Sequence, residues 1–382
     1  MAGPVRKLVA NINLTWVYMS LSWGLVLAAP VSATPVSAAP ADRIVLRNLD
    51  VIDTRTVTSL DEDGVLLDDG TRISWDRIER GRVANEQQAR FDQLLAEIGG
   101  DLYRVRQRMA VGDWAGLLPH AEALEARFVG RRSETAYLVF QALMWARLAT
   151  GKREAALAPY LRVLACQQEA AAAGKTLELP GERRMTVAPQ TGFASDLSPV
   201  WFDVEAARQA LPAVAAAIGE LKAPPPAARV YYATLAIAAG TPEKAEQALA
   251  GLQDFPALRA IVDVQRQLPQ GVPAATLALL AEQLPQIGRE LRPVALYWLG
   301  RARIALPELA VRQEGLLNLL ELPALYGQQE PELAAAGLYE AWQTLSALGD
   351  TKGSIAVRRE LLDRYPSTWH ARKLQAEDEK AK

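Results

Sequence analysis

The chain has 382 residues and a formal net charge of −2, and 50% of its residues are hydrophobic. This composition excludes wholesale disorder, and the near-neutral charge gives no support to nucleic-acid binding, which needs a basic face. One cysteine and two histidines exclude an intramolecular disulfide framework and most histidine-based metal centres. We therefore expect two or three folded units, or one repeat array, with no metal and no cofactor.

Residues 1–41 have the three parts of a secretory signal, followed by a linker rich in Pro, Ala and Ser. Arg6 and Lys7 form the basic start, residues 14–29 form an apolar block, and Val36-Ser37-Ala38 offers a cleavage site. An uncleaved anchor is the alternative, although the block is shorter than the roughly 20 residues of a spanning helix. We expect a periplasmic or extracellular protein, which is held at a membrane only if residues 14–29 are retained.

A small antiparallel β module is expected over residues 42–83, where short β-rich runs alternate with turn signals. Asp68-Asp69-Gly70 favours a tight hairpin, because glycine after aspartate adopts the positive φ that such turns need. The module resembles a small SH3-like or Sm-like barrel in size and rhythm. The expected strands are Ile44-Val45-Leu46, Val51-Ile52, Thr56-Val57-Thr58, Val65-Leu66-Leu67 and Arg72-Ile73-Ser74-Trp75.

From residue 84 onward, apolar residues recur with the period of an α-helix, and Gly and Pro separate the helical segments. Trp114, Leu117, Leu118, Ala121 and Leu124 form one such stripe. The pattern predicts a first set of helical repeats over 84–173 and a second array over 204–376. Residues 377–382 are expected to be a charged tail, in which 377–380 form a frayed, solvated helix end.

Three blocks resemble tetratricopeptide repeats, which are 34-residue helix pairs with small residues where the helices cross. Their turns are expected at Gly151, Gly240 and Gly349, and weaker copies lie near Gly112 and over 296–302. The resemblance is degenerate, because Trp342 and Ser354 stand where the family has smaller side chains. It implies a mainly α fold, a tetratricopeptide-like α-solenoid that follows the β module. The signature residues are Phe140, Leu143, Ala156 and Tyr160 in the first block, Tyr232, Ala233, Ala245 and Leu249 in the second, and Leu338, Ala341, Leu345, Ile355 and Leu361 in the third.

The helical period disappears over residues 174–203, a long insertion for a compact array. Residues 176–181 and 183–187 could form a hairpin. Aromatic residues in the insertion argue against disorder. Either the insertion covers an apolar edge between the two halves of the array, or it enters the concave groove and contributes Trp201, Phe193 and Arg184 to a binding surface.

No motif for phosphate binding, acyl transfer or dinucleotide binding is present, and His120 and His370 are expected to be structural. We therefore expect a non-enzymatic scaffold that binds a protein or peptide on its groove. An envelope protein that binds or cleaves glycans is the alternative, and a membrane-tethered assembly factor is a third possibility. Besides the insertion residues, the expected groove residues are Tyr137, Gln141, Tyr231, Tyr297 and Tyr339.

Overall fold

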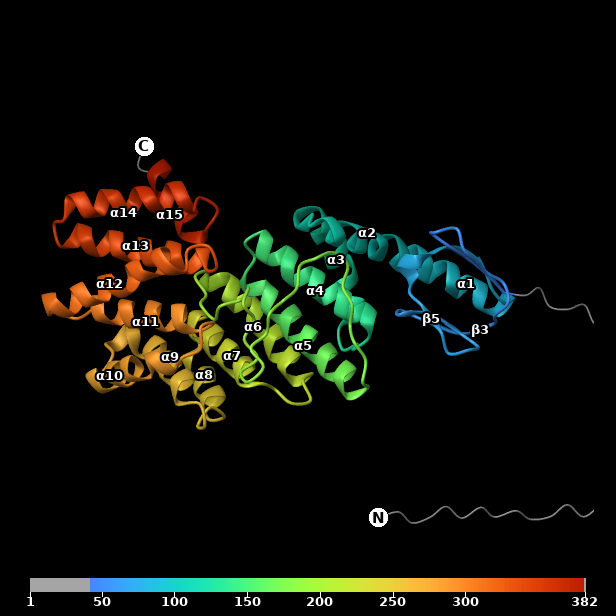
Figure 1. Ribbon diagram of the computed structural model, residues 1–382, viewed down its shortest axis with the longest axis horizontal. Coiled ribbons are helices and arrows are strands. Elements are labelled where there is room, and N and C mark those ends of the chain that lie inside the picture. Colours follow the sequence, from blue (N-terminus) through green and yellow to red (C-terminus); the bar gives the residue numbers. More distant parts are fainter. Residues whose placement is uncertain (1–41, 381–382) are drawn as a thin grey trace, which may run out of the picture. The chain divides into compact units, whose positions relative to one another are not determined.

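The computed structural model describes residues 42–380, so the expected export signal, residues 1–41, lies outside the described range. The described residues belong to a single compact unit. This unit is mainly α-helical and begins with a small antiparallel β module, as the sequence predicted (Figure 1). Within residues 42–380, no helix combines the length and the apolar character needed to cross a membrane.

The β module consists of two three-stranded antiparallel sheets, with strand orders β2-β1-β6 and β3-β4-β5. The expected hairpin across Asp68-Asp69-Gly70 is present, because Val65 pairs with Ile73 and Leu66 pairs with Arg72. The strands are β1 (Arg43–Leu46), β2 (Val51–Ile52), β3 (Val57–Asp61), β4 (Gly64–Leu67), β5 (Arg72–Ile73) and β6 (Ile78–Arg82).

Two features of the module differ from the expectation. The strand expected through Trp75 ends at Ile73, and Trp75 begins a short 3₁₀ turn in which its indole N–H donates to the Asp61 carbonyl at 2.8 Å. Strand β6 was not expected, because only Ile78 in its sequence Ile-Glu-Arg-Gly-Arg is buried. Backbone pairing with β1 forms this strand, and a hydropathy pattern does not detect such pairing.

Fifteen α-helices follow among the described residues. A π-helical turn over Leu95–Gly99 joins the first two. The helices are α1 (Asn85–Leu94), α2 (Gly100–Val111), α3 (Trp114–Phe128), α4 (Glu134–Ala149), α5 (Leu157–Ala172), α6 (Val204–Gly219), α7 (Pro226–Ala238), α8 (Pro242–Leu249), α9 (Pro256–Gln267), α10 (Ala274–Gln283), α11 (Arg292–Ile304), α12 (Leu309–Leu325), α13 (Pro331–Ala347), α14 (Thr351–Arg364) and α15 (Trp369–Lys380).

Local sequence explains where many of these helices begin and end. The side chains of Asp113, Ser133, Asp203 and Asp350 each accept a backbone N–H in the first turn of α3, α4, α6 and α14. Glycines with positive φ end the preceding helices at the expected turns, residues 112, 151, 240 and 349. The charged residues 377–380 form the last turn of α15 and are largely exposed, as expected for a solvated helix end.

Successive helices pack on one another along the chain from α2 to α7 and again from α11 to α14 (Figure 1). Helix α9 packs on both α7 and α11, and thereby connects the two stretches. Each helix alone would expose its apolar face, so burial comes from the stack. One continuous core extends from the β module to α13, and a second, smaller core lies among α13, α14 and α15.

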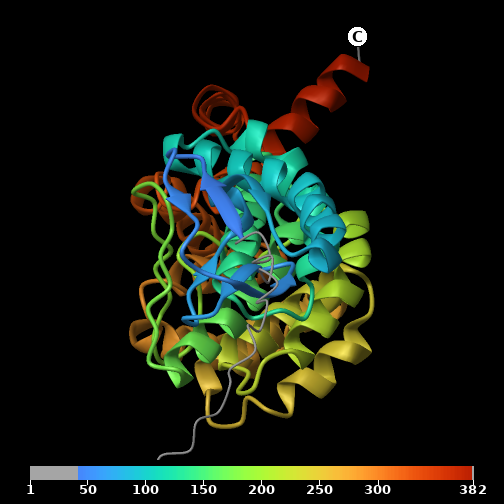
Figure 2. The same ribbon diagram turned by 90° about the vertical axis from the view of Figure 1, so that its right-hand side faces the viewer.

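The insertion contains no helix between Ala172 and Val204, in agreement with the sequence pattern (Figure 2). Residues 176–181 and 183–187 do not form the expected hairpin. The backbone bridge in this region instead joins Val187 to Ala194. The second half of the insertion is part of the main core, because Phe193 and Trp201 are 1% and 5% exposed.

Candidate functional site

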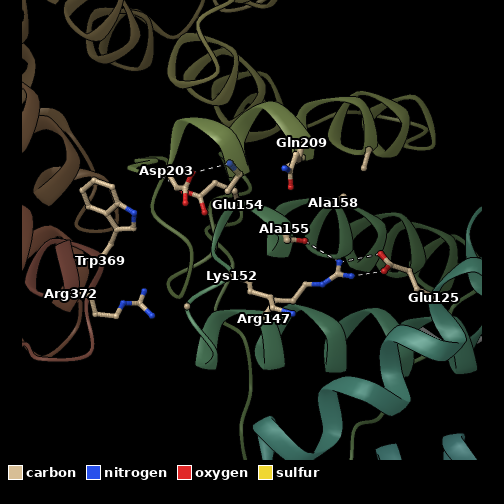
Figure 3. Close-up of a pocket in the computed structure, with 14 residues that line it drawn as sticks. Glu125, Arg147, Lys152, Glu154, Ala155, Ala158, Asp203, Gln209, Trp369 and Arg372 are labelled. Atoms are coloured by element: carbon tan, nitrogen blue, oxygen red, sulfur yellow. Dashed lines mark hydrogen bonds and ion pairs between the residues drawn. The ribbon is translucent and has the colours of Figure 1, made fainter. Parts of the chain in front are cut away.

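A pocket of about 500 Å³ lies where the turn between α4 and α5 meets the first turns of α6 and α15. We call it the α4–α6–α15 pocket. Figure 3 shows Trp369 and Arg372 on one side, Arg147 and Glu125 on the other, and Glu154 and Asp203 between them. Its lining consists of Glu125, Arg147, Gly151, Lys152, Glu154, Ala155, Ala158, Asp203, Ala206, Gln209, Ala210, Ala213, Trp369 and Arg372.

Small side chains make room for this pocket. Five alanines from α6, the start of α5 and the 3₁₀ turn before it line the pocket, and Trp369 is the one aromatic residue in its lining. A pocket with an apolar lining and a few polar groups is the usual form of a ligand site. The five alanines are Ala155, Ala158, Ala206, Ala210 and Ala213.

The basic residues of the pocket differ in whether they are already paired. Arg147 donates to the Glu125 carboxylate at 3.1 Å, and the Lys152 ammonium lies 3.6 Å from the carboxylate of Glu122. Arg372 is exposed and forms no ion pair within residues 42–380. Its guanidinium borders the turn at Gly151, where an added Cβ would lie 3.0 Å from Nη2. Arg372 is therefore the group best placed to bind an incoming carboxylate.

Two acidic residues lie deeper in the same pocket. Asp203 caps α6, because its carboxylate accepts the Ala206 N–H at 2.9 Å. The backbone N–H of Asp203 donates to Glu154 at 3.4 Å. Burial raises the pKa of Glu154 above its ordinary value, although hydrogen bonds from the backbone N–H groups of Glu154 and Asp203 and the charge of Arg153 oppose the shift. The pocket thus offers a buried carboxyl group opposite a free guanidinium.

Of the eight groove residues expected from sequence, Arg184 is exposed and the other seven are buried. The structure brings three of them together, because the rings of Phe193 and Trp201 lie 5.3 and 6.3 Å from the ring of Tyr231. Because these seven side chains are buried, they do not line an open groove in this structure. They are Trp201, Phe193, Tyr137, Gln141, Tyr231, Tyr297 and Tyr339.

The remaining expected residues fall into two other places. Tyr137 and Gln141 lie on α4, where burial raises the pKa of Tyr137 against a hydrogen bond from Gln167 and the charge of Arg184. Tyr297 and Tyr339 belong to an aromatic cluster around Phe202 and His370.

Sequence analysis missed the residues of the pocket. Trp369 and Arg372 are far from Glu154 and Asp203 in the chain, so no local spacing connects them. The capping position of Asp203 before α6 was the one available signal. Within residues 42–380, no three His, Cys, Asp or Glu side chains are grouped so that they could hold a metal ion. No protein family, curated protein or solved structure matches the chain.

Proposed function

We propose that the protein is an exported, non-enzymatic scaffold that binds a protein or peptide at the α4–α6–α15 pocket. The observation that supports this most directly is the way the helices hold the insertion. Side chains of α7, α5 and the α4–α5 turn donate to its backbone carbonyls: Tyr231 to Leu197 at 2.6 Å, Tyr160 to Gly192, and Arg153 to Ser198 at 2.8 Å. Every residue has a backbone carbonyl, so side chains that donate to these carbonyls can hold an extended peptide of almost any sequence. The same kind of contact would hold a partner peptide.

The pocket has the size, the apolar lining and the basic group that would bind the C-terminal end of a peptide. Its volume of about 500 Å³ is within the range of small-ligand sites, roughly 300–1,000 Å³. The alanine lining accommodates an apolar side chain, and Arg372 is available for a carboxylate. Export and membership of the tetratricopeptide-like repeats stay predictions of the sequence, and both agree with a binding role in the cell envelope.

The test compares the full chain with two variants in a pull-down from an envelope fraction. Arg372→Glu reverses the charge at the pocket, and Arg359→Glu makes the same change at a side chain that is 82% exposed on α14. We expect a partner whose recovery falls at least tenfold with Arg372→Glu and is unchanged with Arg359→Glu. Equal recovery with both variants, or no partner together with turnover of a substrate, overturns the proposal.

Glycan binding is the second candidate, because Trp369 shares the pocket with two carboxyl groups, Glu154 and Asp203. Burial shifts the pKa of Glu154 in the direction that a general acid requires. A glycan array and a hydrolase screen with the native chain and Trp369→Ala separate the two candidates. Glycan binding predicts a signal that Trp369→Ala abolishes, whereas the peptide scaffold predicts no glycan signal.

A further inference from the structure

Three side chains form a row along one face of α4, which we call the α4 row: Tyr137, Gln141 and Trp145. They are spaced four residues apart and therefore lie above one another on the same face of the helix. All three are buried, with exposed fractions of 7%, 0% and 0%. The row places a fully buried amide between two buried aromatic side chains.

The first half of the insertion runs near both ends of this row. We call residues 175–187 the strap. Arg183 of the strap lies 5.0 Å from the Trp145 ring centroid and 5.2 Å from that of Trp114. Glu178 lines the same cavity as Glu134 and Thr135, at the start of α4. The strap therefore passes from the beginning of α4 to its far end.

The strap leaves polar atoms of the row without hydrogen-bond partners. Gln141 is fully buried, but neither its Oε1 nor its Nε2 has a hydrogen-bond partner within the described residues, and the Trp145 Nε1 also lacks one. Buried polar groups are nearly always paired, because an unpaired group loses its hydration without compensation. The second half of the insertion is different, since the carbonyls of Thr191 and Leu197 both accept hydrogen bonds from α7.

The unpaired polar groups of Gln141 and Trp145 could form hydrogen bonds with the backbone of an extended peptide. A side-chain amide offers one acceptor and a donor group close together, as a peptide's own N–H and C=O do. The Trp145 indole N–H can donate to one more carbonyl. The contacts of the strap also indicate which side chains the surface would bind. Leu177 and Leu179, two positions apart in the chain, both pack against the core, and the Arg183 guanidinium lies over two tryptophan rings.

We propose that the α4 row is a docking surface for an extended peptide of a partner protein, and that the strap occupies it until the peptide displaces the strap. This inference rests on the proposed function and adds a second contact region to the pocket. The favoured peptide carries apolar residues two positions apart, followed by an arginine. Because the strap competes, the intact chain binds such a peptide more weakly than the row alone does.

The experiment uses a fluorescent peptide with the sequence of residues 175–187 and full-length protein, with anisotropy as the readout. In an opened variant, Leu177, Leu179, Arg183 and Met185 are all changed to Ser, which keeps the chain length. We expect the peptide to bind the opened variant at least tenfold more tightly than the intact chain. Adding Gln141→Leu should remove that gain, whereas adding Gln375→Leu, at an exposed position on α15, should not.

Equal binding to the intact and opened chains overturns the inference, as does a gain that survives Gln141→Leu. Hydrogen exchange of the intact chain tests the same idea without substitutions, and covers the case in which the opened variant does not fold. Backbone amides of residues 176–186 should exchange at least tenfold faster than those of residues 191–200, and equal protection contradicts a displaceable strap. Arg372→Glu should leave binding of the strap peptide unchanged, so failure of the strap and failure of the pocket proposal are distinguishable.

Discussion

His370 is a histidine enclosed by aromatic rings and is 4% exposed. Its ring centroid lies 4.4 Å from that of Phe202 and 5.0 Å from that of Tyr339. Burial lowers the pKa of His370 from 6.5 to about 3, and the charges of Lys373 and Arg301 act in the same direction. The imidazole is therefore neutral in the fold, as expected for a structural histidine. His370 is not among the residues that line the α4–α6–α15 pocket.

This depressed pKa makes the fold sensitive to acid. In the unfolded chain the imidazole binds a proton below about pH 6.5, while in the fold it stays neutral down to about pH 3. Its contribution to stability is complete above pH 6.5 and falls by about 1.4 kcal/mol per pH unit below that value. His370→Phe keeps an aromatic ring and removes the titration, so its stability relative to the native chain should rise by about 2 kcal/mol between pH 7 and pH 5.

Urea unfolding of both chains at several pH values measures this difference. Parallel stability curves for the native chain and His370→Phe would show that the imidazole is not buried in its neutral form.

At the scale of single elements, the contact between α12 and α13 depends on a glycine. A Cβ added at Gly337 would lie 2.5 Å from the Leu319 carbonyl oxygen, closer than neighbouring atoms allow. We expect Gly337→Ala to push the helices apart and to lower the free energy of unfolding by about 1–3 kcal/mol. Gly100→Ala is the matched control, because nothing lies within 4 Å of its added Cβ in α2. The control should be neutral or slightly stabilising in thermal unfolding.

The insertion is held to α7 by one hydroxyl group in particular. The Tyr231 hydroxyl donates to the Leu197 carbonyl at 2.6 Å and accepts the Ala194 N–H at 3.3 Å. Tyr231→Phe leaves both backbone groups buried and unpaired, so we expect a loss of about 1–3 kcal/mol in urea unfolding. Tyr232→Phe, at the next and partly exposed position, should have little effect. Similar stability of the two variants contradicts a structural role for the insertion.

At the scale of the whole molecule, the sequence predicted those features that depend on neighbouring residues alone, such as turns and helix ends. Asp-Gly turns placed the β4–β5 hairpin, and glycines placed four helix turns, because a positive φ is a local requirement. The groove residues could not be predicted in the same way. Helix α4 is buried on all sides from Thr135 to Ala146, so it lacks the polar face that would distinguish core from surface.

The pocket was beyond sequence reasoning for a different reason. It forms where α15 meets the α4–α5 turn, more than two hundred residues earlier in the chain. Only tertiary packing brings α15 next to the α4–α5 turn. The α4–α6–α15 pocket therefore lies where the last helix meets earlier ones, and none of the tyrosines expected in the groove lines it.

Photo-crosslinking in cells tests the central claim, that a protein or peptide occupies the α4–α6–α15 pocket, most directly. A photoreactive residue is placed in the full chain at Gln209, inside the pocket, and in a second chain at Arg359, outside it. The account predicts one discrete protein adduct from position 209, its loss when Arg372→Glu is added, and no such adduct from position 359. No adduct from position 209, or the same adducts from both positions, would contradict it.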